Sequence, residues 1–439
     1  DSERLQMLKV VSCNTQNYKK KLKKYLEKDI LRSTSRIDTV RKIINEVQKG
    51  GDRELLNLTN KYDDNNFKNI KEIEVSKKSI ENSLKYCSRE FLNSTKIAIS
   101  RVKNYQKKLL PKDLFYKDKK GTKLGCLWKS ISSCGLYIPG GKAIYPSSVY
   151  MNAVAAKLAG VKRIVLVSPA KEKKISPEIL ATAKLSGVDK VYMIGGAQAI
   201  AALAYGTKTI EKVDKIFGPG NAFVAEAKKQ VFGDVGIDSV AGPSEIMIVA
   251  DNKSNPEWIA IDLLSQAEHD EDARAILLTD SLTLIKSVNN YLVKYLKILD
   301  RKKIASFSIR NNGIAIKIPK LSAAYKVIDL LAPEHLQIIC KGGQGLAKKV
   351  NNAGAIFVGS YTPEAFGDYV AGPSHVLPTS GNARFESGLS VLDFFKRSSY
   401  IEANKEGLFN LVSNIDNLAN IEGLTAHALS ANIRFLKRN

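Results

Sequence analysis

Two side chains able to bind a metal ion lie three residues apart near the end of an expected helix. Gln266 and His269 follow an apolar helical pattern that begins at Pro256. Side chains at this spacing share one helix face, and an amide oxygen with an imidazole nitrogen suits a borderline ion such as zinc. Taken alone, the pair is better explained by a polar helix end with a hydrogen-bonded histidine. A metal site therefore requires further ligands.

The chain has only four histidines among its 439 residues, and three lie outside this segment: His335, His375 and His427. Asp368 and His427 could supply further ligands, although no spacing motif marks either of them. Glu334 directly precedes His335, and a carboxylate beside an imidazole can move the protons that an oxidation or a hydrolysis needs. Adjacent strand residues face opposite ways, so a surface turn is the simpler explanation unless the chain is redirected there.

Glycine-rich turns stand at three expected strand or helix boundaries: Gly140-Gly141, Gly195-Gly196 and Gly218-Pro219-Gly220. Free backbone amides at such turns could hold a phosphate, although ordinary tight turns explain them as well. The chain has no GxGxxG fingerprint, so ordinary Rossmann dinucleotide binding is not supported. It also lacks GxSxG and Walker motifs, and we interpret Ser374-His375 as part of a loop rather than as a hydrolase dyad.

The elements that must position these residues alternate between apolar strands and capped helices from Leu136 to about Thr279. This alternation predicts a doubly wound parallel sheet. Upstream, apolar residues at helical spacing from Val40 to Val47 end at Gly50-Gly51, and residues 76–108 read as one helix. Residues 113–131 resemble a hairpin. The glycine- and proline-rich passage 359–388 is expected to be a functional loop.

Composition limits the class of protein. With 44% hydrophobic and 26% charged residues, the chain is typical of a soluble globular protein. No apolar run reaches the length of a membrane helix. The first residues lack a secretory signal, although a start at Asp1 leaves a removed leader possible. Five cysteines without CxxC spacing argue against disulfides and favour the reducing cytoplasm.

The net charge of +24 raises the question of nucleic acid. The densest lysine run, residues 19–24, lies in a helical pattern without interleaved aromatic residues. A solvated helix face explains that run better than a binding platform does. We therefore predict neither a nucleic-acid nor a membrane partner.

Taken together, these segments resemble the histidinol dehydrogenase family over nearly the whole chain, from Val47 to His427. The most specific matches are Gly135 to Gly141, Tyr145 to Ser148, Gly195 to Ile200, Gly218 to Asn221, Ala241 to Glu245, Ser265 to His269, Pro333 to Leu336, Gly367 to Tyr369, Gly372 to Thr379 and Glu422 to His427. The resemblance implies oxidation of L-histidinol to L-histidine through an aldehyde, in two NAD-linked steps, with one zinc ion per subunit.

The resemblance also implies roles for individual residues. The implied zinc ligands are Gln266, His269, Asp368 and His427. The implied acid-base pair is Glu334 and His335. The implied NAD contacts are Tyr137, Gln198 and Asn221. Substrate would be held by the zinc ligands and by His335, Ser244 and Glu422. In the family the C-terminal tail reaches the partner subunit, so a homodimer with shared active sites is expected.

The fold implied is α/β, with two incomplete Rossmann-like halves and small helical dimerisation elements at both termini. We expect an N-terminal helical arm over 1–30 and a first globule from 31–130 and 241–388 that carries the zinc and acid-base residues. The NAD-binding globule would be 131–240, and the tail 389–439. A zinc hydrolase using the same metal site is the alternative, and a basic nucleic-acid-binding protein would explain the charge but not the clustered histidines.

Overall fold

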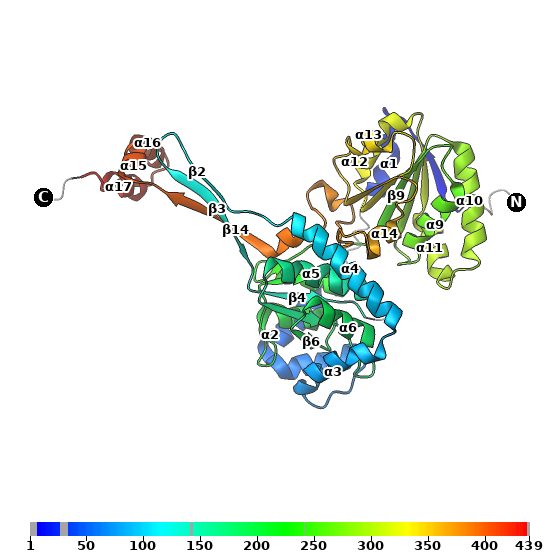
Figure 1. Ribbon diagram of the computed structural model, residues 1–439, viewed down its shortest axis with the longest axis horizontal. Helices are drawn as coiled ribbons and strands as arrows, with labels where there is room; N and C mark the ends of the chain where they lie inside the picture. Colours follow the sequence, from blue (N-terminus) through cyan, green and yellow to red (C-terminus); the bar gives the residue numbers. More distant parts are fainter. Residues whose placement is uncertain (1–6, 27–33, 141–143, 241, 437–439) are drawn as a thin grey trace.

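The computed structural model describes residues 7–26, 34–140, 144–240 and 242–436. These residues form two α/β globules, and a slender arm that carries the C-terminal helices extends away from them (Figure 1). Parallel sheets in both globules confirm the predicted α/β class. None of the helices in the described ranges is long and apolar enough to cross a membrane.

The first globule is built on a six-stranded sheet in the order β1-β11-β10-β9-β12-β13, in which every neighbouring pair is parallel. Its strands are β1 (Lys9–Ser12), β9 (Glu245–Ala250), β10 (Arg274–Thr279), β11 (Ile314–Lys317), β12 (His335–Ile338) and β13 (Ala355–Val358). Its helices are α1 (Tyr18–Leu26), α9 (Pro256–Ala267), α10 (Leu282–Leu296), α11 (Lys302–Asn312), α12 (Ala324–Leu331), α13 (Gly343–Ala347) and α14 (Glu364–Tyr369).

Alternating residues of the central strand β9 enter two different cores. Ile246 and Ile248 pack with apolar residues of α9, α10 and α11 on one face. Met247 and Val249 pack with residues of α1, α12 and α13 on the other face. Because successive strand side chains point to opposite faces, an uninterrupted apolar run is what a strand covered on both sides requires.

The N-terminal segment does not form the helical arm expected for residues 1–30. In its described part, β1 adds a parallel strand beside β11. Leu22 of α1 is fully buried in the core that α12 shares. Apolar residues in this lysine-rich stretch are thus buried against the sheet, so the segment is an integral part of the first globule. Residues 1–6 and 27–30 of the expected arm lie outside the described residues.

The second globule contains a five-stranded parallel sheet in the order β6-β5-β4-β7-β8. Its strands are β4 (Ser133–Tyr137), β5 (Arg163–Val167), β6 (Lys190–Tyr192), β7 (Lys215–Phe217) and β8 (Gly236–Ile237). Its helices are α5 (Pro146–Ala159), α6 (Pro177–Ser186), α7 (Gly196–Tyr205) and α8 (Ala222–Val231). The chain runs outward from β4 in both directions, so β4 and β7 flank the topological switch point where such sheets bind ligands.

Three helices expected in the first globule belong to the second: α2 (Thr34–Tyr62), α3 (Lys77–Ser83) and α4 (Arg89–Lys108). The apolar face of α2, from Val40 to Val47, shares a core with Ile200 and Leu203 of α7. The grouping of residues 31–130 with 241–388 is therefore wrong for these helices, because the core that covers α2 belongs to the other sheet. The break at Gly51 (φ 56°) is confirmed.

Residues 76–108, expected as one helix, form α3 and α4 with a short 3₁₀ turn after α3. Cys87 and Ser88 are both extended, and the Ser88 hydroxyl accepts a hydrogen bond from the backbone amide of Phe91. Ser88 thus caps a new helix at a point where apolar periodicity alone shows no interruption.

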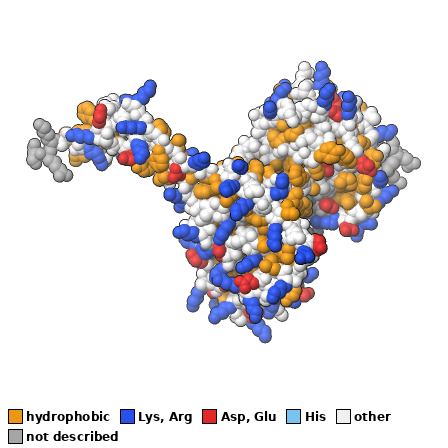
Figure 2. Space-filling model, viewed as in Figure 1, with side chains coloured by type: hydrophobic (Ala, Val, Ile, Leu, Met, Phe, Trp, Pro, Cys, Tyr) orange, Lys and Arg blue, Asp and Glu red, His pale blue; other side chains and the backbone are white. Residues whose placement is uncertain are grey.

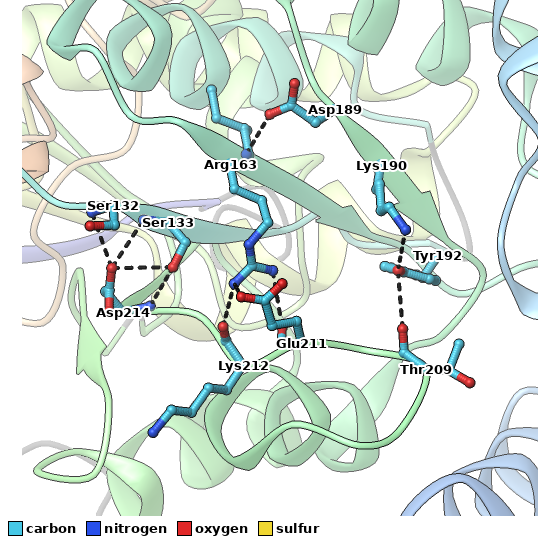
Figure 3. A network of polar contacts seen from close by, with 11 residues as sticks. Ser132, Ser133, Arg163, Asp189, Lys190, Tyr192, Thr209, Glu211, Lys212 and Asp214 are labelled. Atoms are coloured by element: carbon cyan, nitrogen blue, oxygen red, sulfur yellow. Dashed lines mark hydrogen bonds and ion pairs between the residues drawn. The ribbon is translucent and has the colours of Figure 1, made fainter.

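Polar side chains fasten the amino ends of the strands in the second sheet (Figure 3). Asp214, before β7, accepts hydrogen bonds from the amides of Ser132 and Ser133 at 3.1 and 3.0 Å, which joins β7 to β4. The guanidinium of Arg163, on β5, donates to the backbone carbonyls of Glu211 and Lys212. Hydrogen bonds thereby join neighbouring segments at the end of the sheet opposite to the switch point.

The arm is a three-stranded antiparallel sheet followed by a helical tip. Its strands are β2 (Leu114–Lys117), β3 (Lys123–Ser130) and β14 (Phe395–Glu402), and its helices are α15 (Lys405–Phe409), α16 (Val412–Ile421) and α17 (Thr425–Asn432). The β2–β3 pair confirms the predicted hairpin. Large apolar side chains are exposed on the arm (Figure 2), among them Ile401, Phe409, Leu418, Ile421, Leu429 and Ile433. Such a surface is unusual for a part of the chain that stays in water.

Candidate active site

Glu334 and His335 are both held by the backbone of Glu245, the first residue of β9. The Glu245 amide donates to Glu334 Oε2 at 2.7 Å, and His335 Nδ1 lies 2.9 Å from the Glu245 carbonyl oxygen. The left-handed backbone of Ala332 (φ 48°) turns the chain just before Pro333. That turn resolves the difficulty that adjacent residues face opposite ways. The two side chains meet at 3.7 Å at the amino end of the sheet.

Two further carboxylates come from α14, one helical turn apart. Glu364 Oε1 lies 3.6 Å from His335 Nδ1, and Asp368 Oδ1 lies 3.7 Å from His335 Nε2. Ligand atoms of His335, Glu364 and Asp368 all lie within 4.8 Å of one another, a grouping that could hold a metal ion. Our sequence analysis missed Glu364. Its spacing of four residues from Asp368, within an expected loop, was the available signal.

Burial and charge perturb the pKa of each of these groups. Burial raises the pKa of both Glu334 and Glu364 to about 8. Burial also disfavours the imidazolium of His335, but Glu364 and Glu334 outweigh it and raise the pKa of His335 well above its usual range. Burial acts to raise the pKa of Asp368, yet the neighbouring His335 lowers it overall. Ionisation of Glu334 and Glu364 near neutral pH therefore requires a further positive charge nearby, which a bound cation would supply.

The predicted pair at the end of α9 reaches this cluster. Gln266 is 1% exposed, and with its amide nitrogen turned to Glu364 it donates to Oε1 at 2.5 Å. His269 follows α9 and is exposed. Partial desolvation lowers the pKa of His269, and the negative charge of Asp368 only partly offsets this shift. Gln266 therefore contacts the cluster around His335, and His269 lies near enough to Asp368 for their charges to interact.

The fourth expected ligand lies elsewhere. His427 is on α17, at the far end of the arm from α9 and α14 (Figure 1). Glu422, between α16 and α17, is also on the arm, and both residues are exposed. Within one chain, neither residue approaches the cluster. Ser244 immediately precedes Glu245, and its carbonyl accepts from the Arg274 amide at 2.9 Å, so it lies at the same sheet edge.

The remaining histidine links the two globules. His375 Nδ1 lies 2.9 Å from the backbone oxygen of Asp368, and its Nε2 lies 3.5 Å from the hydroxyl of Ser148 on α5. Tyr150, also on α5, donates to the Tyr369 carbonyl at 2.9 Å. Helix α5 starts beyond the carboxyl end of β4. The ligand-binding end of the second sheet therefore faces the acid-base cluster of the first.

The expected NAD contacts surround the switch point of the second sheet. Tyr137 is the last residue of β4, and Asn221 caps α8 after the turn that follows β7. Gln198 is in the first turn of α7, and its side chain is buried beside Asp63. Burial raises the pKa of Asp63, and Gln198 partly offsets that shift.

Three backbone amides of the glycine turns near this crevice are already hydrogen-bonded. The Gly195 amide donates to Asp63 at 3.0 Å, and the Gly196 amide donates to the Tyr137 hydroxyl at 3.1 Å. The Gly218 amide donates to Asp238 at 2.8 Å. The hypothesis that these amides cradle a phosphate is therefore not supported at Gly195, Gly196 and Gly218, because side chains of the same chain already accept from them. Gly141 lies outside the described residues.

The fold and the site together define a two-globule α/β oxidoreductase, in which a ligand-binding switch point faces a buried imidazole–carboxylate cluster. The histidinol dehydrogenase family model matches residues 27–435. The chain is 48% identical to histidinol dehydrogenase 1 of Nostoc sp. over 396 residues, 90% of this chain and 91% of that protein. It is also 48% identical to histidinol dehydrogenase of Agrobacterium fabrum, over 90% of this chain and 91% of that protein.

The solved structures agree with the sequence relatives. The crystal structure of histidinol dehydrogenase from Elizabethkingia anophelis superimposes with a TM-score of 0.91 at 32% identity, covering 98% of each chain. The chain belongs to the histidinol dehydrogenase family. Its activity is accordingly the NAD-dependent histidinol dehydrogenase activity of histidine biosynthesis.

Proposed function

We propose that the enzyme oxidises L-histidinol to L-histidine through L-histidinaldehyde at the cluster around His335, with two NAD molecules as successive hydride acceptors. The observation that carries this proposal is the buried His335 Nε2, which has no hydrogen-bond partner although carboxylates surround the ring. In its deprotonated form this nitrogen can accept the hydroxyl proton as hydride leaves for NAD, and the surrounding carboxylates raise its basicity.

Zinc fits the residues at this site. The donor set of Gln266, His269 and Asp368 combines amide oxygen, imidazole and carboxylate, and the lowered pKa of Asp368 keeps its carboxylate ionised. We propose that these three residues hold one zinc ion per subunit, with His427 of a second copy as the fourth ligand. When bound, zinc would hold the substrate by its imidazole and amine and so orient the alcohol carbon.

His335 would act as the general base in the first oxidation. Its Nδ1 faces the Glu245 carbonyl, which favours a proton on Nδ1 and leaves Nε2 to accept one. The hydroxyl proton of histidinol would pass to Nε2 while hydride leaves the same carbon for NAD. The products are the aldehyde and NADH. Ser244, at the same sheet edge, and Glu422 of a second copy would hold the substrate.

Glu334 would serve the second oxidation. Its carboxylate would take a proton from water as the water oxygen bonds to the aldehyde carbon, while the aldehyde oxygen takes the proton that His335 accepted in the first step, which gives the hydrate. The hydrate then loses hydride to a second NAD and a proton to His335, which yields the carboxylic acid, and release of its proton to solvent gives the carboxylate of histidine. Enclosure between the two globules would retain the aldehyde between the two steps. Tyr137, Gln198 and Asn221 would contact each NAD in turn.

A homodimer with shared active sites is supported by the arm. Its exposed apolar side chains lack cover within one chain, and it carries Glu422 and His427 away from their own cluster. We propose that each arm lies against a second copy and completes that copy's site. All five cysteines are free thiols, which suits the reducing cytoplasm. None of them contributes to the cluster described above, so a thiolate route through a covalent intermediate is disfavoured.

An absorbance assay for NADH with L-histidinol, run before and after chelation, tests the proposed function. We expect two NADH per histidinol consumed, loss of turnover on removal of the metal, and recovery when zinc is restored. Bound zinc without NADH formation would instead favour a zinc hydrolase. NADH formation that survives complete metal removal would exclude the proposed role for zinc.

A further inference from the structure

The carboxylate of Glu364 is the most buried charged group of the site, with 2% of its surface exposed. It begins α14, where its neighbour Pro363 occupies the N-cap position with extended backbone. Gly367, in the same helix, allows α14 to lie against the ring of Phe357 on β13, because a Cβ atom there would meet that ring at 2.5 Å. The position of Glu364 is therefore determined by close packing of α14 on the sheet.

Glu364 contacts one expected metal ligand directly. Its Oε1 and Oε2 lie 2.5 and 3.2 Å from the amide nitrogen of Gln266 when that nitrogen faces the carboxylate. In the reverse orientation, the amide oxygen of Gln266 would face two oxygens of Glu364, which repel it when the carboxyl group is ionised. The ionised carboxylate accepts without donating, so it imposes one orientation on the neighbouring amide.

We propose that Glu364 is a positioning residue for the metal site, because it holds the nitrogen of the Gln266 carboxamide and so leaves the carbonyl oxygen as the ligand atom. A carboxamide binds zinc through its oxygen, and free rotation would present the nitrogen half of the time. Groups that orient a ligand in this way commonly change metal affinity by 10–100-fold. The inference rests on the proposed function in one respect, that Gln266 is a zinc ligand.

The test measures zinc affinity at equilibrium, by competition between the full-length protein and a chromophoric chelator, and needs no turnover. We expect Glu364→Gln and Glu364→Ala to weaken zinc binding by about 10–100-fold. In the Gln266→Ala background the same changes should have less than about a threefold further effect, because the amide that Glu364 orients is gone. Glu364→Gln keeps the side-chain volume, and thermal unfolding of the zinc-free variants verifies that each one folds.

Asp262→Asn is the matched control. Asp262 lies one turn before Gln266 on α9, and its carboxylate accepts a hydrogen bond from Gln337 at 2.7 Å rather than from Gln266. Removing this charge tests for a general electrostatic effect, and we expect a change in zinc affinity of less than about threefold. Only the variants at Glu364 should depend on the presence of Gln266.

Each other outcome overturns a distinct statement. An equal loss with and without Gln266 would show that Glu364 acts through its charge, and would refute positioning. Unchanged zinc affinity in Glu364→Gln and Glu364→Ala would also refute positioning. If the wild-type protein still bound zinc, the proposed function would not be affected by that result. Failure of the wild-type protein to bind zinc would overturn the proposed metal site and, with it, this inference.

Discussion

Glu334 Oε2 accepts a hydrogen bond from the amide of Glu245 at 2.7 Å, between neighbouring strands of the first sheet. A glutamine at position 334 can keep this bond through its side-chain oxygen but cannot take a proton from water. We therefore expect Glu334→Gln to slow aldehyde oxidation by about 10²–10⁴-fold, as for loss of a general base. Alcohol oxidation should change far less. Rates of the two half-reactions, measured with histidinol and with histidinaldehyde, test this, and equal losses would refute the assignment.

His335→Asn should impair both half-reactions, because each one releases a proton at the same position. Asparagine can still approach the Glu245 carbonyl but offers no basic nitrogen where His335 Nε2 lies. We expect a loss of at least about 10²-fold in single-turnover rates of both steps. Zinc content provides the control, since His335 is not among the expected ligands. An alcohol step at the wild-type rate would contradict the role of His335.

Subunit mixing tests whether His427 acts in a second copy. Neither His269→Ala nor His427→Ala should be active alone, because each lacks a zinc ligand in every site. A heterodimer of the two variants has one intact site, and random exchange makes about half of the dimers heterodimers, so about a quarter of wild-type activity should return. No regained activity, despite subunit exchange verified by mass spectrometry, would count against a shared site.

A buried ion pair supports the turn that leads to Asn221. Lys228 pairs with Asp238 and also donates to the Gly218 carbonyl at 2.9 Å, while Asp238 accepts from the Gly218 amide. Lys228→Met leaves an uncompensated buried carboxylate, and we expect a loss of about 3–5 kcal/mol in the free energy of unfolding. The KM for NAD should rise as the turn loosens.

Urea unfolding measures the effect of Lys228→Met, and the exposed pair Lys42–Glu46 serves as the control. Lys42→Met should cost less than about 1 kcal/mol, because solvent screens that pair. The double variant Lys228→Met/Asp238→Asn should lose less than the sum of its single variants, since no charge is left unpaired. Equal effects at the buried and exposed pairs would contradict this account.

Asp63 should make stability depend on pH. Burial raises its pKa from 3.8 to about 6, although the Gly195 amide and Gln198 oppose that shift. The folded state then binds the proton more tightly, so this contribution to stability is complete below about pH 4 and is lost as the pH rises through 6.

Asp63→Asn removes this titration. Relative to wild type, the variant should therefore gain on the order of 1 kcal/mol in unfolding free energy between pH 5 and pH 7.5. Its amide oxygen can still accept from the Gly195 amide. Urea denaturation at both pH values measures the change, and a difference that does not vary with pH would exclude the shifted carboxyl.

The sequence by itself determined the local features of this protein. Apolar runs such as Ile246–Ala250 have to be covered on both faces, which predicts parallel strands in layers. Gly51 ends a helical pattern because its backbone conformation is left-handed (φ 56°). The segments at Gln266, Glu334 and Asp368 could be singled out because their side chains carry chemistry that ordinary turns and helix ends do not need.

Only the tertiary structure decided which of these segments meet. As an amphipathic helix, α2 could cover either sheet, and in the structure its apolar face packs with α7 in the second globule. In the sequence, nothing distinguishes Glu364 from other carboxylates in loops. In the structure, packing of α14 places it beside Gln266 and His335. The sequence suggested that the amides of Gly195 and Gly218 could bind a ligand. In the structure they donate hydrogen bonds to the side chains of Asp63 and Asp238. Such contacts join residues far apart in the sequence, so the local spacing of residues does not predict them.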